Sequence, residues 1–139
     1  MTVTTLVVAG RLNNLNDFIN ALSYNRYSGG TMKKYNEKII KQPFTEGQYD
    51  LNYGDKWIFI WHTCDRRRDL DNIGSAVKFI LDSFQSLKFI KNDGYRNNRL
   101  LTHYYADDVP DKDYEYVEII HCTELTEYIE QLEENIKWY

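Results

Sequence analysis

Residues 56–64, with the sequence KWIFIWHTC, constrain the fold more than any other part of the chain. The run from Trp57 to Trp61 is entirely large and apolar. A strand with one face in water would alternate apolar and polar side chains, so this run predicts a strand that is covered on both faces. We therefore expect a sheet with this strand inside it and other elements packed on either side.

Hydrophobic periodicity predicts the elements around this strand. Strands are expected over residues 3–10 and 114–122, with a turn and then a strand or irregular passage over 91–108. Helices are expected over residues 12–41 (broken at Ser28-Gly29-Gly30), within residues 65–94 and over residues 123–139. The order β-α-α-β-α-β-β-α predicts an α/β or α+β fold, in which residues 1–139 form one small domain with a mixed sheet flanked by helices.

Each predicted helix carries an apolar stripe that should face the core. The stripes are Leu15, Phe18, Ile19 and Leu22 in the first helix, Ile73, Val77, Ile80 and Phe84 in the middle one, and Leu125, Ile129, Leu132 and Ile136 in the last. Candidate N-cap residues are Asn13 or Asn14 for the first helix and Thr123 for the last.

The charge of the chain is unevenly distributed. The net charge of −4 does not by itself favour a nucleic-acid partner. However, residues 107–139 hold eleven Asp or Glu against two Lys, whereas residues 1–106 hold 15 basic against ten acidic residues. A basic body is compatible with a phosphate-bearing partner, and the acidic segment 107–139 could engage a basic protein partner.

The cysteine content and the first residues predict a cytoplasmic protein without a membrane partner. Cys64 and Cys122 are the only cysteines, too few for a disulfide framework. The opening sequence reads as a strand and lacks the basic region of a signal peptide. Histidines precede both cysteines, but His121 and Cys122 would point to opposite faces of a strand, so a joint zinc site is poorly supported.

Three aspartates between residues 65 and 94 form a candidate metal site. Asp69 and Asp71 are two residues apart at a helix start, where an extended segment would point both to the same side. Asp93 lies in an Asn-Asp-Gly turn. Carboxylates without nearby His or Cys favour Mg²⁺ or Mn²⁺ over zinc, and two such ions about 4 Å apart are the usual apparatus for hydrolysing a phosphodiester.

Lys78 strengthens this hypothesis. It follows Asp71 by seven residues, which is about 20° around a continuous α-helix, so both are expected on the face opposite the apolar stripe. A cation there could bind the scissile phosphate or the transition state, with Asp82 orienting it. The alternative is structural, because aspartates commonly cap helices and form turns. Spacing alone leaves both readings open.

The sequence DLDNIGSAVKFILDSFQ…IKNDG, over residues 69–94, resembles the signature of the RusA-like Holliday junction resolvases, a family of crossover junction endodeoxyribonucleases. Their pattern is a D-x-D-N helix start, a lysine in the helix, an aspartate one turn on and a distal acidic turn. Residues 10–34, GRLNNLNDFINALSYNRYSGGTMKK, also resemble the start of members carried by phages of Gram-positive bacteria.

The resemblance implies a phage or prophage protein of the bacterial cytoplasm with a RusA-like nuclease domain. It would be a homodimeric, Mg²⁺-dependent endonuclease, with Mn²⁺ as a possible substitute, that resolves four-way DNA junctions in recombination and repair. On this resemblance the metal-binding and catalytic carboxylates are Asp69, Asp71 and Asp93, the catalytic lysine is Lys78, and the supporting residues are Asn72 and Asp82.

The chain departs from the family pattern in three ways, one of which is the acidic segment 107–139, since a junction binder is expected to be basic overall. Many members place the lysine four residues after the second aspartate, where this chain has Ser75, and many have two adjacent acids where this chain has Asn92-Asp93. The residues expected to contact the DNA backbone are Arg66, Arg67, Arg68, Asn16, Asn20, Arg26 and Lys33. The alternative is an ordinary solvated run for the arginines, and helix capping or surface solvation for the N-terminal residues. The rival hypothesis is a non-catalytic, phage-encoded module that binds DNA or protein on the same scaffold.

Overall fold

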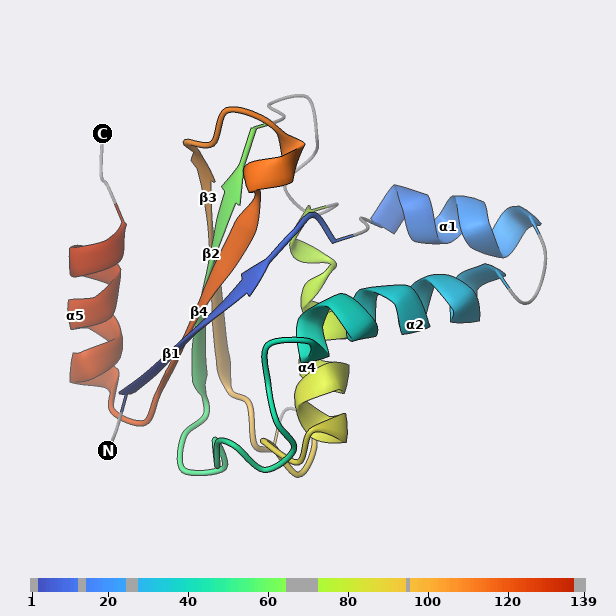
Figure 1. The fold of residues 1–139 in the computed structure, drawn as a ribbon. Coiled ribbons are helices and arrows are strands. Elements are labelled where there is room, and N and C mark those ends of the chain that lie inside the picture. The colour runs from blue at the N-terminus through green and yellow to red at the C-terminus, as the bar shows by residue number, and fades with distance from the viewer. Residues whose placement is uncertain (1–2, 13–14, 25–27, 65–72, 95, 137–139) are drawn as a thin grey trace.

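The computed structural model describes residues 3–12, 15–24, 28–64, 73–94 and 96–136 (Figure 1). In chain order the elements are β1 (Val3–Ala9), α1 (Leu15–Tyr24), α2 (Ser28–Lys41), β2 (Lys56–Thr63), α4 (Val77–Ser86), β3 (Leu100–Asp107), the short 3-10 helix η1 (Lys112–Tyr114), β4 (Tyr116–Cys122) and α5 (Leu125–Asn135). The fold is α+β, as the order of predicted elements indicated, and the uncertain passage before residue 108 contains a regular strand.

The strands form one mixed sheet in the order β1-β4-β2-β3. β4 pairs antiparallel with both β1 and β2, and β2 pairs parallel with β3. β2 therefore has a hydrogen-bonded neighbour on each side, and it is buried from Trp57 to Thr63. This confirms that the apolar run is an inner strand covered on both faces.

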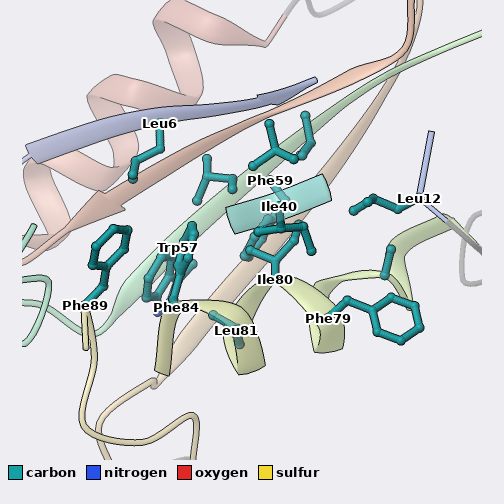
Figure 2. Close-up of a cluster of buried hydrophobic side chains, with 14 of the residues drawn as sticks. Leu6, Leu12, Ile40, Trp57, Phe59, Phe79, Ile80, Leu81, Phe84 and Phe89 are labelled. Atoms are coloured by element: carbon teal, nitrogen blue, oxygen red, sulfur yellow. The ribbon is translucent and has the colours of Figure 1, made fainter. Parts of the chain in front are cut away.

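Helices cover the two faces of the sheet separately, with α1, α2 and α4 on one side and α5 on the other (Figure 1). Alternate residues of β2 enter the two cores. Trp57 and Phe59 join the larger cluster, which Figure 2 shows packed against Ile80 and Phe84 of α4. Ile58 joins the smaller cluster beneath α5. The period-two geometry of a strand assigns the side chains to these faces.

The break between the first two helices differs from the prediction. α2 already begins at Ser28, so Gly29 and Gly30 lie inside a helix rather than at a break. Ile19 and Leu22 are 48% and 49% exposed, so their predicted burial is wrong. The reason is that α1 lies beyond α2 and away from the sheet (Figure 1), which leaves part of its apolar stripe uncovered. The structure does not describe the predicted cap residues 13 and 14, nor the side chains of Leu15 and Phe18.

The core positions of the middle helix are confirmed, but its continuity is not. Ile73, Ile80 and Phe84 are buried, and Val77 packs against them. However, α4 begins only at Val77, after a turn in which the Ala76 amide donates to the Ile73 carbonyl at 3.2 Å. Because such i→i−3 bonds belong to a helix of about three residues per turn, residues 73–76 do not continue the regular α-helix that the prediction assumed, and residue 71 lies outside the described residues.

α5 buries only part of the stripe that was predicted for it. Leu125 and Ile129 are 55% and 46% exposed, whereas Tyr128 is buried and Leu132 packs beside it. Only the C-terminal half of the predicted stripe therefore faces the sheet. The predicted N-cap is also wrong, since Glu124 precedes the helix and the Thr123 hydroxyl donates instead to the Tyr53 carbonyl at 3.1 Å.

Candidate functional site

The structure describes only part of the predicted site. The predicted residues that lie outside the description are Asp69, Asp71, Asn72, Arg66, Arg67, Arg68 and Arg26, together with the side chain of Asn16. Asn20 is described and is exposed on α1. The predictions for the first group stay predictions. Four other predicted residues, Lys33, Lys78, Asp82 and Asp93, are described and lie in one cluster.

Lys78 joins α4 to the turn that follows it. Its Nζ donates to Oδ1 of Asp82 at 3.0 Å and to Oδ2 of Asp93 at 3.1 Å. Asp82 lies one helical turn beyond Lys78, so α4 itself brings those two together, whereas Asp93 comes from the connection after the helix. These bonds, first to Asp82 and then to Asp93, raise the pKa of Lys78 above 10.5 and keep it cationic.

Lys33 extends the cluster to α2. Its Nζ lies 3.2 Å from Oδ2 of Asp82, an ion-pair distance, although that buried oxygen has no well-directed hydrogen bond among the described residues. Burial alone would raise the pKa of Asp82, but the ammonium groups of Lys78 and Lys33 outweigh it and keep that pKa below 3.8. Asp82 is thus an ionised carboxylate between two lysines, which supports its predicted orienting role.

A buried amide holds the turn that carries Asp93. The side chain of Asn98 donates to the carbonyls of Asn92 and Gly94 at 3.1 and 3.0 Å, and its Oδ1 accepts from the Trp57 indole at 2.9 Å. Asn98 is 9% exposed, so these bonds are shielded from water. Asn98 was not among the predicted site residues, because nothing in the local sequence distinguishes an Asn that links a polar turn to the core.

A second missed contact lies at the end of β2, next to residues 65–72. Glu115 is 5% exposed, and both its oxygens accept from Arg11, at 2.7 and 2.9 Å. The same carboxylate accepts the Cys64 backbone amide at 3.2 Å. Glu115 therefore anchors the last described residue before the predicted metal-binding segment. Its position within an acidic stretch of sequence gave no sign of a buried arginine partner.

Asp93 is the one predicted metal ligand that the structure describes. Asp93 is partly exposed, and only its Oδ2 is bonded to Lys78, while its Oδ1 makes no hydrogen bond or ion pair with the described residues. A free carboxylate oxygen is the type of ligand that Mg²⁺ prefers. Within the described ranges no three His, Cys, Asp or Glu side chains gather as a metal site, and the other two predicted ligands lie outside those ranges.

The histidines do not form a joint site with the cysteines. Trp57 pairs with His121 and His62 pairs with Tyr116, so the histidines lie five positions apart along β2. Burial raises the pKa of the Cys122 thiol to about 11, which disfavours the thiolate that zinc requires.

His62 instead forms a bridge. Its Nδ1 lies 2.7 Å from Asp108 and its Nε2 lies 2.6 Å from Glu118. Because the two ring nitrogens point in opposite directions, these carboxylates cannot share one ion with the ring. The cluster joins β2 and β4 to the end of β3.

Comparisons with known proteins do not show a family. No family model matches the chain, and no curated protein matches it. Among solved structures, the chain is similar to one in a helical model of the TubZ-Bt four-stranded filament, with 12% identity and a TM-score of 0.34. The match covers 96% of this chain and only 27% of that one. So distant a similarity says nothing about activity.

None of the helices in the described ranges has the length and apolar content needed to cross a bilayer.

Proposed function

We propose that the chain is a Mg²⁺-dependent, structure-selective endodeoxyribonuclease that resolves four-way DNA junctions by paired phosphodiester hydrolysis. One observation carries the proposal: the predicted catalytic lysine contacts two predicted carboxylates from different elements, Asp82 of α4 and Asp93 of the following turn. A helix cap and a turn would need no lysine between them. The sequence signature over residues 69–94 supplies the reaction class.

In this proposal Lys78 is the cation that receives the scissile phosphate. Its side chain is 68% exposed, so the ammonium group is accessible although both carboxylates hold it. An ammonium group has three donors, and the two carboxylates use two of them, which leaves one for a phosphate oxygen. Asp82 keeps Lys78 and Lys33 in place. Placing fixed positive charge where negative charge develops is the general basis of such catalysis.

Asp69, Asp71 and Asp93 would hold the metal. Bound Mg²⁺ would activate water and stabilise the leaving oxygen. Asp93 also bonds to Lys78. If Asp93 turned to bind the metal, Lys78 would still be held by Asp82. Homodimerisation belongs to the same proposal, because a four-way junction has near two-fold symmetry and its resolution requires two symmetric cuts.

Cleavage of a mobile four-way junction beside a linear duplex, with and without Mg²⁺, tests the proposal. The native chain should nick the junction only with Mg²⁺. Asp71→Asn should abolish cleavage, and Lys78→Gln should lower its rate by about 10²–10³, the usual effect of removing one transition-state donor. Glu130→Gln, on the exposed side of α5, is the matched control and should cleave normally. Equal cleavage by Asp71→Asn would refute the assignment of roles.

The rival function, a non-catalytic binding module, is favoured by one observation. Leu125 and Ile129 are exposed on a helix whose charged residues are all glutamates, a surface suited to a basic protein partner. Metal titration by calorimetry separates the two hypotheses. Mg²⁺ or Mn²⁺ binding that Asp69→Asn abolishes supports the nuclease, whereas no metal binding supports the module.

A further inference from the structure

A row of lysines on α2 lies outside the proposed catalytic cluster. Lys34, Lys38 and Lys41 follow one another at i, i+4 and i+7, which places them within about 60° of each other around the helix. Lys34 and Lys38 are exposed and make no ion pair with the described residues. Together with Glu37 and Gln42, the three lysines line an open groove of about 590 Å³.

Two contacts fix this row relative to α4. The Lys41 ammonium donates to the Ser86 hydroxyl at 2.8 Å, at the C-terminal ends of both helices. Lys33, near the start of α2, pairs with Asp82 in the middle of α4. These two contacts, at different points along the helices, hold α2 against α4. The lysine row therefore has a fixed position relative to the cluster that contains Lys78.

The sheet separates the charges of the molecule. α2 contains four lysines and one glutamate, whereas α5 contains four glutamates and no basic residue. These helices lie on opposite sides of the sheet (Figure 1). A polyanion is therefore attracted to the side of α2 and α4 and repelled from the side of α5, although the whole chain has a net charge of −4.

We propose that the row of Lys34, Lys38 and Lys41 binds the sugar-phosphate backbone of one DNA arm, away from the phosphate that Lys78 would receive. From Lys34 to Lys41 the helix rises about 10 Å, which corresponds to about three base-pair steps measured along the DNA axis. Tyr35, 60% exposed beside the row, offers a ring to a sugar or base face. This inference depends on the proposed function in one respect only, namely that the DNA is a four-way junction.

An acidic helix of a second copy is the competing occupant, because α5 has the complementary charge. α5 also exposes Leu125 and Ile129, which need an apolar partner surface. The groove beside the row is lined by lysine, glutamate and glutamine alone, so it provides none. A phosphate backbone, which needs only cations and hydrogen-bond donors, fits this groove better.

Fluorescence anisotropy with a labelled four-way junction and a labelled linear duplex, in EDTA and over a range of NaCl concentrations, tests the inference. Lys34→Ala/Lys38→Ala should weaken binding of both DNAs and reduce the slope of log K against log[salt] by about two, one counterion for each lost phosphate contact. Lys112→Ala removes an exposed lysine of η1 and should leave the slope unchanged.

The outcomes separate this inference from the proposed function. Unchanged affinity and salt slope in the double variant would overturn the inference, even if that variant cleaves junctions. Lysine-dependent binding by a native chain that cleaves nothing in Mg²⁺ would keep the inference and remove the nuclease. If sedimentation at low salt shows self-association that the double variant loses, and DNA binding is unaffected, the row belongs to a second copy and the inference fails.

Discussion

At the scale of single residues, the geometry of the candidate site depends on polar groups that are shielded from water. Asn98 ties the turn of Asp93 to the indole of Trp57, and Glu115 ties the end of β2 to Arg11. A buried polar group that loses its partner costs about 1–3 kcal/mol, more if it is charged, so such contacts hold their segments in a single arrangement. Each connects a segment near the proposed chemistry to the sheet.

Gly74, which precedes α4, lies very close to side chains of β3. A Cβ added there would lie 2.5 Å from the Tyr105 hydroxyl and 3.5 Å from the His103 ring. We predict that Gly74→Ala lowers the free energy of unfolding by about 1–3 kcal/mol, the usual cost of overpacking. In a Tyr105→Phe background the hydroxyl is absent, so the same substitution should cost clearly less. Urea unfolding of the four variants of this double-mutant cycle measures the difference.

Gly30→Ala is the matched control for that prediction. Gly30 is exposed within α2, and an added Cβ would meet nothing within 4 Å. Alanine there should stabilise the chain by about 0.5–1 kcal/mol, since glycine is a poor helix former. An equal cost of Gly74→Ala in both tyrosine and phenylalanine backgrounds would show that the hydroxyl contact does not limit this position.

At the scale of elements, packing partners decide which face of an amphipathic helix is buried. α5 packs on the sheet through Tyr128 and Leu132, and α1 lies beside α2 and away from the sheet. Each helix therefore leaves apolar side chains exposed to water. Periodicity predicted both helices but not which of their apolar side chains would be covered by a neighbouring element. Tyr128 had been overlooked because its ring has a polar end, yet it is 5% exposed.

The corrected face of α5 leads to a direct comparison of two substitutions. Tyr128→Ala should lower the free energy of unfolding by about 3–5 kcal/mol, as for other large buried rings. Leu125→Ala, at a position 55% exposed, should change it by at most about 0.5 kcal/mol. Chemical denaturation monitored by circular dichroism measures both. If Leu125→Ala lowered the free energy of unfolding more than Tyr128→Ala, the stripe predicted from the sequence, and not Tyr128, would form the buried face of α5.

At the scale of the whole molecule, two histidines make stability depend on pH. Burial lowers the pKa of His103 and of His121 below 6.5. His103 accepts the Trp61 indole proton on Nδ1 at 2.9 Å, which requires that nitrogen to be unprotonated. The unfolded chain binds these protons more readily than the folded chain. The contribution of the two neutral histidines to the free energy of unfolding should therefore be fully present above about pH 6.5 and decrease as the pH falls below that value.

We therefore expect the free energy of unfolding, measured with urea, to decrease between pH 7.5 and pH 5.5, by at most about 1.4 kcal/mol per histidine per pH unit. His103→Gln keeps an acceptor for Trp61 but does not titrate, so its pH dependence should be flatter than that of the native chain. The carboxylate of Asp82, with its pKa below 3.8, contributes no change in this range. Identical pH profiles for the native and His103→Gln chains would contradict the prediction.

The sequence by itself determined the elements and the inner strand, because backbone periodicity and continuous apolarity are local properties. It also selected Lys33, Lys78, Asp82 and Asp93 as residues of interest, although it related residues 71 and 78 by a continuous helix that the turn at Ser75–Ala76 interrupts. What local patterns could not supply was contact between segments far apart in the chain.

Only the tertiary structure placed Lys33 of α2 beside Asp82, Arg11 beside Glu115, and Asn98 beneath the turn of Asp93. It also set a basic helix and an acidic helix on opposite sides of one sheet. The physical reason is that a side chain acquires a partner, and a helix face acquires a cover, only when the strands pair in one order. That order is a property of the whole core and of no single segment.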